Sequence, residues 1–335
     1  MRKVAVLGAG AWGTALAKVL ADKGLPTALW ARRPELTDAI ERDRANERYL
    51  PGAVLPPTLT ATARLGVALD GAELVVLVVP SHAMRDTMRE AAGLFAEGAL
   101  LCSASKGIEN ETLMLMSEVL VDVLGRDVEP RLTFLSGPSF AQEVATRQPT
   151  TVVVAGRDKG ATERVQHAFA TDRFRVYASD DVVGVEVGGA LKNVVAIAAG
   201  IVDGLGFGTN TRAALITRGL AEMSRLASAK GAQPLTLAGL SGMGDLVLTC
   251  TGSLSRNRTV GCELGRGKRL AEILAALGHV AEGVKTTKSA YDLGRRLGVD
   301  LPITNEVYRV LYEDKTARQA VIDLMTRPLK SSETS

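Results

Sequence analysis

The first half of the chain alternates short apolar runs with stretches of helical periodicity. Val4–Leu7 and Thr27–Trp30 have the length and composition of strands. Between them, Trp12–Lys23 is patterned as a helix that stops at Gly24. Leu74–Val79 is apolar at every position, as expected for a central strand buried on both faces. Strands that alternate with helices in this way predict a parallel sheet with crossover helices.

This alternation continues to about residue 180, and helical patterns dominate after Asp181. Further strands are predicted at Ala99–Cys102, Leu132–Leu135, Thr151–Ala155 and Phe174–Tyr177, and further helices from Pro34 and from Pro80-Ser81 to about Phe95. Thr249–Gly267 is predicted to be a polar loop with a helix start, and Lys330–Ser335 a frayed tail. We therefore predict an α/β fold, with a Rossmann-type, doubly wound, mainly parallel sheet over residues 1–180 and an all-helical domain over residues 181–335.

Composition and charge restrict the class of protein. A chain of 335 residues is long for one compact domain, and an apolar fraction of 46% is enough for hydrophobic cores. The net charge is only +3, with no basic arm and no RNA or DNA module motif, so we expect no nucleic-acid partner. The cysteines and histidines are scattered, which offers no metal site. A small anionic substrate suits this charge balance.

Neither a signal peptide nor a membrane span is expected. The N-terminal segment becomes glycine-rich at Gly8, before the apolar core of a signal peptide could form. The longest apolar runs, Leu74–Val79 and Val194–Val202, are shorter than the ~20 residues that a span needs. We therefore expect a cytoplasmic protein, and the sequence leaves its oligomeric state open, a homodimer included.

The first strand leads into the glycine pattern Gly8-Ala-Gly-Ala-Trp-Gly13, which opens a helix. Gly8 would permit the tight turn, Gly10 the close approach of a pyrophosphate, and Gly13 the packing of the helix on the sheet. The helix N-terminus would then receive the phosphate charge. This strand–turn–helix setting indicates a dinucleotide site, whereas the alternative is a tight turn without a ligand.

The end of the second predicted strand indicates which dinucleotide would bind. A site that prefers NAD usually has an acidic residue there for the ribose 2′-hydroxyl. This chain has Arg32 and Arg33, and the first acid is Glu35. Two guanidinium groups suit a 2′-phosphate, which favours NADPH over NADH. The alternative is a pair of solvated loop arginines.

Lys192 is the only charged residue between Glu186 and Asp203, in a helix that is apolar nearly all round. Such a helix is a buried one, and a buried ammonium group needs a partner or a functional reason. Desolvation would bring its pKa toward the range useful for acid–base catalysis. The alternative is a lysine whose long stem reaches the surface.

Two downstream segments offer partners for this lysine and for a substrate. Asp245 follows closely spaced glycines, which suggest a close backbone approach, and its carboxylate would orient Lys192. It could instead merely cap a helix. Ser255-Arg256-Asn257-Arg258 places a hydroxyl, cations and an amide at a predicted helix start, where a substrate phosphate could bind. Loop cations of this kind are also often simply solvated.

Several stretches of the chain carry a family resemblance. They are Gly8–Ala17, Val79–His82, Ser105–Glu109, Ser136–Ala141, Glu186–Asn193, Gly239–Leu246, Ser255–Asn257 and Ala281–Gly283. In this order, and over nearly the whole chain, they resemble the bacterial NAD(P)-dependent glycerol-3-phosphate dehydrogenases. One departure is Ala11, where the family often has Ser or Thr, so a hydroxyl contact to the cofactor phosphate is missing. Backbone amides can still bind that phosphate.

The resemblance implies the reversible reduction of dihydroxyacetone phosphate to sn-glycerol 3-phosphate, a phospholipid precursor, with NADPH preferred over NADH and no metal. Lys192 would exchange the proton at the reacting oxygen, and Lys106 would polarise the carbonyl between cofactor and substrate. The implied polar network around that oxygen is completed by Asp245, Asn193 and Thr249. The implied substrate site also includes Arg256 and Asn257 at the phosphate, with Ser255, Gly137 and Ser139 lining it. The implied cofactor contacts are Gly8, Gly10, Ala11, Trp12, Gly13, Arg32, Arg33, Lys106, Ala141, Arg256, Val280 and Glu282.

Two other functions are compatible with parts of this pattern. A dehydrogenase of β-hydroxy acids or sugar acids also combines a helical second half with a lysine beside an asparagine, but Ser255-Arg256-Asn257 and the segment before Asp245 favour the triose phosphate. The second alternative is a redox-sensing protein that binds a dinucleotide without turnover. In such a protein, Lys192, Lys106 and Asp245 would have no catalytic role. NADPH binding without oxidation by dihydroxyacetone phosphate would favour the sensor.

Overall fold

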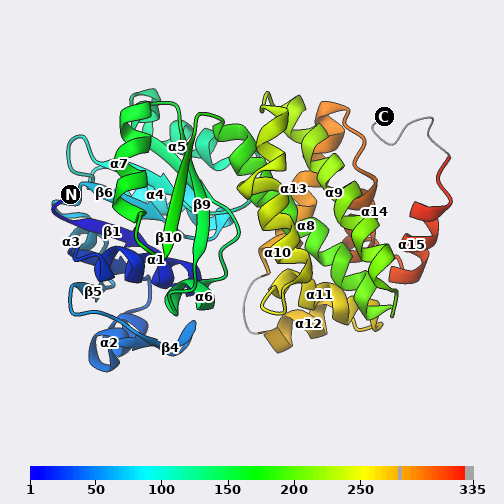
Figure 1. Ribbon diagram of the computed structural model, residues 1–335, viewed down its shortest axis with the longest axis horizontal. Helices are drawn as coiled ribbons and strands as arrows, with labels where there is room; N and C mark the ends of the chain where they lie inside the picture. Colours follow the sequence, from blue (N-terminus) through cyan, green and yellow to red (C-terminus); the bar gives the residue numbers. More distant parts are fainter. Residues whose placement is uncertain (278–280, 329–335) are drawn as a thin grey trace. The chain divides into compact units, whose positions relative to one another are not determined.

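The computed structural model describes residues 1–277 and 281–328, and the chain divides into two units. The first unit comprises Met1–Lys106 and Met116–Val185, and the second comprises Gly107–Leu115 and the chain from Glu186 onward (Figure 1). The short segment Gly107–Leu115 therefore packs with the second unit although it interrupts the sequence of the first. One of its anchors is the hydrogen bond from the Arg296 guanidinium to the carbonyl oxygen of Thr112, at 3.1 Å.

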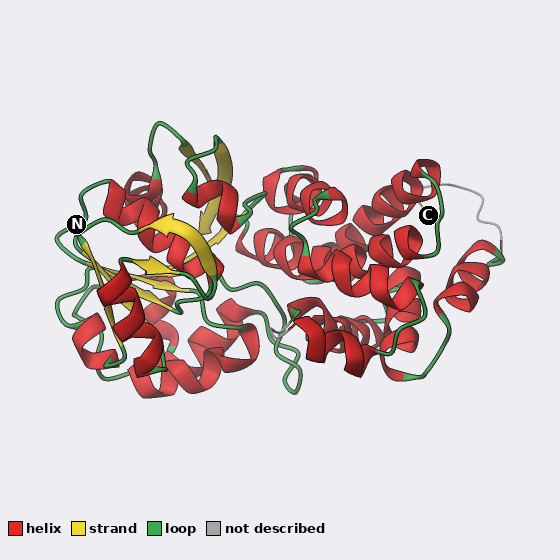
Figure 2. Cartoon of the chain, turned by 90° about the horizontal axis from the view of Figure 1, so that it is seen from below, coloured by secondary structure: helices red, strands yellow, loops and turns green. Residues whose placement is uncertain are grey.

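The first unit is built on an eight-stranded sheet with the order β10-β9-β8-β7-β6-β1-β2-β5. Figures 1 and 2 show this sheet with helices packed around it. Its strands are β1 (Val4–Leu7), β2 (Thr27–Trp30), β5 (Leu59–Thr62), β6 (Leu74–Leu77), β7 (Leu100–Ser103), β8 (Leu132–Ser136), β9 (Thr150–Gly156) and β10 (Phe174–Ser179). All neighbours pair in parallel except β8 and β9, which are antiparallel. The prediction of a mainly parallel, Rossmann-type sheet is confirmed.

Helices connect these strands and supply the rest of the core. They are α1 (Ala11–Asp22), α2 (Pro34–Asp43), α3 (Leu65–Leu69), α4 (Met84–Ala91), α5 (Met116–Leu124), α6 (Ala141–Ala145) and α7 (Lys159–Phe169), with one-turn segments η1 (Ser81–Ala83) and η2 (Arg126–Arg131). Leu16 and Leu20 of α1 and Phe169 of α7 are fully buried in one hydrophobic cluster with β1 and β6. This burial holds α1 against the sheet, so its N-terminus lies directly after β1.

The segment between α2 and β6 contains strands that the sequence pattern does not predict. Two strands there, β3 (Ala45–Asn46) and β4 (Leu50–Val54), form an antiparallel pair, and β5 joins the edge of the main sheet beside β2. Pro51 and Gly52 interrupt β4, and Gly52 has a φ of +74°, so this strand lacks the apolar alternation that identifies one. The predicted strand Leu74–Val79 also ends earlier, at Leu77, before the turn at Pro80.

Helices make up the second unit, as predicted. They are α8 (Val182–Gly204, which begins in the first unit), α9 (Thr209–Ala229), α10 (Asp245–Thr251), α11 (Arg256–Gly265), α12 (Leu270–Leu277), α13 (Glu282–Leu297), α14 (Pro302–Tyr312) and α15 (Ala317–Met325), with short turns η3 (Pro234–Ala238) and η4 (Leu240–Gly244). In the described part of the chain, α8 alone is long and apolar enough to cross a membrane, but 94% of its apolar window is buried within the protein. It is the central core helix of this unit.

The prediction of a polar loop with a helix start over Thr249–Gly267 is right about the helix start, which is at Arg256, but wrong about the length of the loop. This stretch contains the end of α10 and all of α11, and the break between them is only residues 252–255. Gly261 serves helix packing, because a Cβ there would lie 2.0 Å from the carbonyl oxygen of Ile197 in α8. Glycines in a helix can therefore indicate a close neighbour rather than a loop. The predicted frayed tail, Lys330–Ser335, lies outside the described residues.

Candidate active site

The turn between β1 and α1 requires glycine at two of its three glycine positions. Gly8 has a φ of +122°, and a Cβ there would lie 2.7 Å from the carbonyl oxygen of Val78. A Cβ on Gly13 would lie only 1.8 Å from the carbonyl oxygen of Gly8, so α1 packs tightly against the turn. Gly10 differs, because nothing lies within 4 Å of its Cβ position. The turn thus leaves open space over Gly10, where a pyrophosphate group would fit.

The position of this turn in the sheet also suits a dinucleotide. From β1 the chain continues to β2 on one side, whereas β6 pairs with β1 on the other. The carboxyl end of β1 is therefore a topological switch point, where open α/β sheets bind ligands. Ala11 and Trp12 begin α1 here, and the first turn carries no acidic side chain that would repel a phosphate.

Asn46, which no sequence motif indicates, supports the turn. Its Nδ2 donates to the carbonyl oxygen of Ala9 at 3.0 Å and to the Thr14 hydroxyl at 2.7 Å, and the side chain is buried. The missed pair β3–β4 thus has a structural role, because it holds an amide against the glycine turn. The residues are more than thirty positions apart in the sequence, so no local pattern could reveal this contact.

Arg32 and Arg33 follow β2 and are exposed. The Arg33 guanidinium donates to the Tyr49 hydroxyl and lies 5.8 Å from the centre of the Tyr49 ring. Arg48 approaches the same ring, at 5.5 Å. Within the described residues neither Arg32 nor Arg33 forms an ion pair, so the carboxyl end of β2 carries uncompensated positive charge.

Lys106 and Gly137 follow neighbouring strands of the same sheet, β7 and β8. The Lys106 ammonium lies 3.4 Å from the carbonyl oxygen of Gly137, which also accepts from the Ser139 hydroxyl at 2.9 Å. Gly137 has a φ of +134°, and a Cβ there would lie 3.0 Å from Cα of Val152, so glycine is required. Ala141 begins α6 a few residues later. These groups form a polar cluster at the carboxyl ends of the parallel strands.

In the second unit, Lys192 forms a buried ion pair with Asp245. Nζ of Lys192 donates to Oδ1 of Asp245 at 2.6 Å and to the Thr249 hydroxyl at 3.0 Å. The lysine is 7% exposed and the aspartate 1%. Lys192 does not extend to the surface, because its ammonium group is buried and paired with the Asp245 carboxylate.

Gly188 allows the segment before Asp245 to approach α8, and Gly242 allows the same segment to pack against η3. A Cβ on Gly188 in α8 would lie 2.5 Å from the carbonyl oxygen of Ser241. A Cβ on Gly242 would lie 2.0 Å from the carbonyl oxygen of Leu237. The turn η4 can therefore lie directly on α8, and α10 begins from it with Asp245 at the level of Lys192. Close backbone approach, which the glycines predicted, positions the carboxylate.

The neighbouring Cys250 stays a neutral thiol at physiological pH. Burial raises its pKa to about 12, although the charge of Lys192 opposes this effect. A neutral buried thiol is a poor nucleophile, which leaves Lys192 and Asp245 as the charged groups of this cluster. Among the residues that the structure describes, no group of three or more His, Cys, Asp or Glu side chains could hold a metal ion.

The start of α11 places Ser255, Arg256 and Asn257 at different depths. The Ser255 hydroxyl caps the helix, accepting from the Arg258 backbone amide at 3.2 Å. Arg256 is exposed and makes no ion pair within the described residues. Asn257 is buried, and its Nδ2 donates to Oδ1 of Asn193 at 2.9 Å. The helix start thus presents one solvent-facing cation, while Asn257 turns inward toward the lysine helix.

Arg258 has a structural partner instead. It bonds Asp203 of α8 at 2.7 Å, and Arg212 bonds the same carboxylate at 2.9 Å. Glu282, for which a cofactor contact was expected, is half-buried at the start of α13. Val280, expected in the same role, lies outside the described residues.

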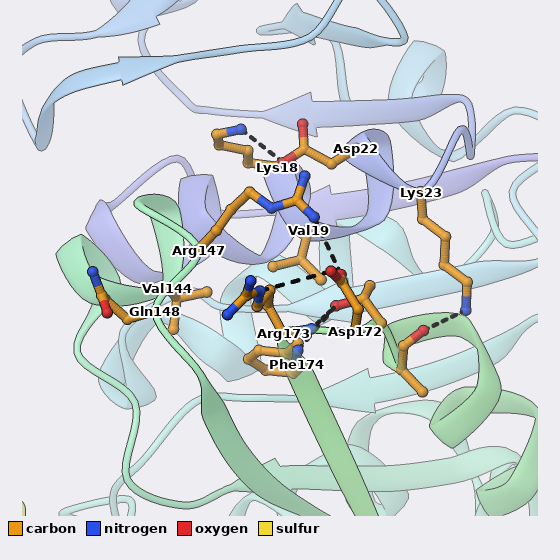
Figure 3. A pocket seen from close by; sticks show the side chains of 12 residues that line it. Lys18, Val19, Asp22, Lys23, Val144, Arg147, Gln148, Asp172, Arg173 and Phe174 are labelled. Atoms are coloured by element: carbon orange, nitrogen blue, oxygen red, sulfur yellow. Dashed lines mark hydrogen bonds and ion pairs between the residues drawn. The ribbon is translucent and has the colours of Figure 1, made fainter.

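A separate hollow of about 250 Å³ lies in the first unit (Figure 3). The end of α1 and the segments before β9 and β10 line it, and it contains none of the residues described above. Its charged side chains bind other groups of the protein: Lys18 bonds Asp22 at 2.7 Å, Arg147 bonds Asp172 at 3.1 Å, and Lys23 donates to the carbonyl oxygen of Ala170 at 2.8 Å. This hollow is therefore no candidate for the active site.

A Rossmann-type unit with an open glycine turn, joined to a helical unit with a buried lysine–aspartate pair, defines a nicotinamide-dinucleotide dehydrogenase. Family models extend this result: residues 3–162 match the N-terminal domain and residues 181–322 the C-terminal domain of NAD-dependent glycerol-3-phosphate dehydrogenase. The chain belongs to this family.

Individual relatives agree with this assignment. The chain is 57% identical to "Glycerol-3-phosphate dehydrogenase [NAD(P)+]" of Geobacter sulfurreducens and 58% identical to that of Geobacter metallireducens, each over 98% of both chains. The crystal structure of glycerol-3-phosphate dehydrogenase from Coxiella burnetii superposes with a TM-score of 0.93 at 41% identity, covering 97% of this chain and 99% of that one. A ketopantoate reductase from Ralstonia eutropha, at 19% identity and a TM-score of 0.59, shares the fold alone.

Proposed function

We propose that the chain catalyses the reversible reduction of dihydroxyacetone phosphate to sn-glycerol 3-phosphate, with Lys192 as the proton donor. The observation that carries this proposal is the buried Lys192–Asp245 pair, with its 2.6 Å separation, in a member of the glycerol-3-phosphate dehydrogenase family. When bound, the reduced dinucleotide supplies the hydride for the carbonyl carbon. Lys192 supplies the proton for the carbonyl oxygen, so the ketone becomes a secondary alcohol.

Asp245 and Thr249 keep the lysine in a state suited to this role. A charged ammonium group in an apolar helix core is destabilised by the loss of its hydration. The Asp245 carboxylate compensates that loss, and the Thr249 hydroxyl adds a second hydrogen bond. Together they hold the ammonium group charged and fixed in orientation. A positioned proton donor of this kind contributes about 10²–10⁴-fold to a rate.

Arg256 is the proposed anchor of the substrate phosphate. Its guanidinium is exposed at the first position of α11, and within the described residues no carboxylate neutralises it. A guanidinium can bind a phosphate through two parallel hydrogen bonds, and the helix N-terminus adds a favourable dipole. From the first unit, Lys106, Gly137 and Ser139 are proposed to line the substrate, with Lys106 polarising the carbonyl.

NADPH is the proposed preferred cofactor, and NADH the weaker one. The turn Gly8–Gly13 would receive the pyrophosphate on the amides that begin α1. The 2′-phosphate would bind Arg32 and Arg33, which lie at the carboxyl end of β2 without ion-pair partners among the described residues. A site for NAD alone would have a carboxylate at this point. In the cytoplasm, the product would supply glycerophospholipid synthesis.

The direct test follows the oxidation of NADPH and of NADH separately, each with dihydroxyacetone phosphate. The proposal expects turnover with both cofactors and a higher kcat/KM with NADPH. Turnover that is faster with NADH would contradict the assignment of Arg32 and Arg33. Cofactor binding without any oxidation would contradict the enzymatic proposal and favour a redox-sensing protein.

A further inference from the structure

The buried side chain of Asn46 holds the peptide group that leads into the glycine turn. Its Nδ2 donates to the carbonyl oxygen of Ala9 at 3.0 Å and to the Thr14 hydroxyl at 2.7 Å. These two acceptors use both N–H bonds of the amide, so its orientation is fixed. Asn46 is 1% exposed, and its Oδ1 is buried without a hydrogen-bond partner among the described residues. An unpaired buried acceptor costs stability, so packing alone does not explain an amide at this position.

The pairing of β3 with β4 keeps Asn46 in this place. Asn46 pairs with Leu50 across the two strands, and its carbonyl oxygen accepts from the Tyr49 backbone amide at 3.2 Å. Leu50 is 1% exposed and belongs to the same hydrophobic cluster as Leu16 of α1. The strand that carries the amide and the helix that follows the turn are therefore anchored in one core.

The hydrogen bond to Ala9 also sets the direction of the next backbone amide. The peptide bond between Ala9 and Gly10 is trans, so its C=O and N–H bonds point in opposite directions. Because the carbonyl oxygen of Ala9 points to the buried Asn46, the N–H of Gly10 points to the opposite side of the turn. Gly10 is half-buried, and nothing lies within 4 Å of its Cβ position. Asn46 thus directs a backbone donor away from the core.

The first amides of α1 are left without an acceptor. Within residues 1–277 and 281–328, no group accepts from the backbone N–H groups of residues 10–13. Asn46 contributes to this, because it occupies the carbonyl oxygen of Ala9, which would accept from the Gly13 amide if the helix began one residue earlier. Other helices are capped by their own side chains, as α7 is by Asp158. Uncapped amides at a helix N-terminus suit an anionic ligand.

We propose that Asn46 is a positioning residue for the dinucleotide, which directs the N–H of Gly10 toward the pyrophosphate and keeps the first amides of α1 available for it. This inference rests on the proposed cofactor site at the glycine turn. Asn46 acts indirectly, because Ala9 and Thr14 use both of its N–H bonds and its Oδ1 is buried. NADPH and NADH share the pyrophosphate, so Asn46 contributes equally to the binding of both. The preference between them is left to the arginines after β2.

Asn46→Ala removes the donor and releases the carbonyl oxygen of Ala9. We expect the dissociation constants of NADPH and of NADH to rise by the same factor, about 10-fold, which corresponds to one hydrogen bond to a charged group. The KM for each cofactor should rise with them, while kcat at saturating cofactor stays close to that of the parent chain. Thr58→Ala is the matched control, because the Thr58 hydroxyl donates to the carbonyl oxygen of Ala21 at the other end of α1, at 2.8 Å. It should leave both dissociation constants unchanged.

The decisive measurement repeats Asn46→Ala in a Gly10→Ala background, where a methyl group already occupies the space proposed for the pyrophosphate. A residue that acts only through this turn should then change the NADPH dissociation constant by less than about threefold, since coupled residues are not additive. Equal losses in both backgrounds, no loss in either, or a loss for one cofactor alone would overturn the proposal. If Asn46→Ala does not fold, Asn46→Ser, whose side chain is too short to reach Ala9, decides the test. A parent chain that binds both dinucleotides without turning over dihydroxyacetone phosphate would contradict the proposed function and leave the role of Asn46 standing.

Discussion

The ammonium group of Lys192 lies 2.6 Å from Oδ1 of Asp245, and both side chains are almost completely buried. The two residues are 53 positions apart in the sequence. The pair is therefore a product of tertiary packing, and it is made possible by Gly188, which allows the segment before α10 to approach α8. A buried charge pair of this kind is better explained by catalysis than by stability, because apolar residues would fill the same space at least as well.

Removing one partner of this pair should be far more destabilising than removing one from an exposed pair. Asp245→Asn leaves the Lys192 ammonium buried without a counter-charge, and we expect the free energy of unfolding to fall by about 3–5 kcal/mol. The matched control is Asp292→Asn, which breaks the exposed Lys288–Asp292 pair at 2.9 Å and should change stability by about 0–1 kcal/mol. Urea unfolding measures both. If the two substitutions lowered the free energy of unfolding equally, the buried pair would contribute no more to stability than the exposed pair.

Gly10→Ala should separate cofactor binding from folding. Nothing lies within 4 Å of the Cβ position, so the fold accepts a methyl group there. That methyl group would occupy the space proposed for the pyrophosphate, and NADPH should bind at least about 10-fold more weakly while Tm stays close to that of the parent chain. Gly66→Ala, in α3, is the control, because its Cβ position is also open but distant in sequence from the turn. Unchanged NADPH affinity in Gly10→Ala would place the pyrophosphate elsewhere.

Arg32→Ala tests the basis of cofactor preference. Loss of one guanidinium opposite a 2′-phosphate should weaken NADPH binding by about 10-fold and leave NADH binding unchanged, since NADH lacks that phosphate. Titration of both cofactors against the variant measures the ratio of their dissociation constants. Arg89→Ala, at an exposed ion pair on α4, serves as the control for a general loss of positive charge. An unchanged ratio of the NADPH and NADH dissociation constants would show that Arg32 does not determine the cofactor preference.

Glu222 should make the stability of the second unit depend on pH. Burial raises the pKa of this carboxyl to about 7, although the backbone amides of Ile303 and Thr304 at the start of α14 oppose the shift. The unfolded carboxyl titrates near 4.5, so between about pH 4.5 and 7 the folded protein binds the additional proton. The contribution of Glu222 to stability therefore falls as pH rises through this window and levels off above it.

Glu222→Gln removes this titration. Relative to the parent chain, the variant should gain stability as pH rises from about 5 to about 8, by more than about 1 kcal/mol. Chemical unfolding at several pH values gives the difference, with Glu163→Gln at an exposed ion pair as the control. A difference that does not change with pH would show that the Glu222 carboxyl titrates alike in the folded and unfolded chains.

Local pattern was sufficient for much of the fold. β1 and β2 begin and end where their four-residue runs predict, because each run is bounded by residues that end a strand. The lysine helix also followed from its composition, since one charge in a long apolar stretch is unusual. The loop in Thr249–Gly267 was predicted too long for a physical reason: glycine occurs both in loops and at close helix contacts, and only the presence of α8 distinguishes them.

The polar contacts between distant segments could not be predicted in the same way. Asn46 supports the glycine turn from the two-residue strand β3, whose partner β4 is interrupted by Pro51 and Gly52. The hydrogen bonds of Asn257 to Asn193 and Gly283 join residues 64 and 26 positions apart, so no local pattern could predict them. Sequence identifies which residues carry useful chemistry, but the direction of an amide depends on which groups the fold brings to its two ends.

The central claim, that Lys192 donates the proton, is tested most directly by single-turnover reduction of dihydroxyacetone phosphate with Lys192→Ala. The measurement uses saturating NADPH. Lys288→Ala, which removes an exposed lysine, is the control. We predict a rate at least ~10²-fold lower than that of the parent chain, an NADPH affinity that is nearly unchanged, and a control at the parent rate. A Lys192→Ala variant that reacts at the parent rate would contradict the claim and make Lys106 the next residue to test.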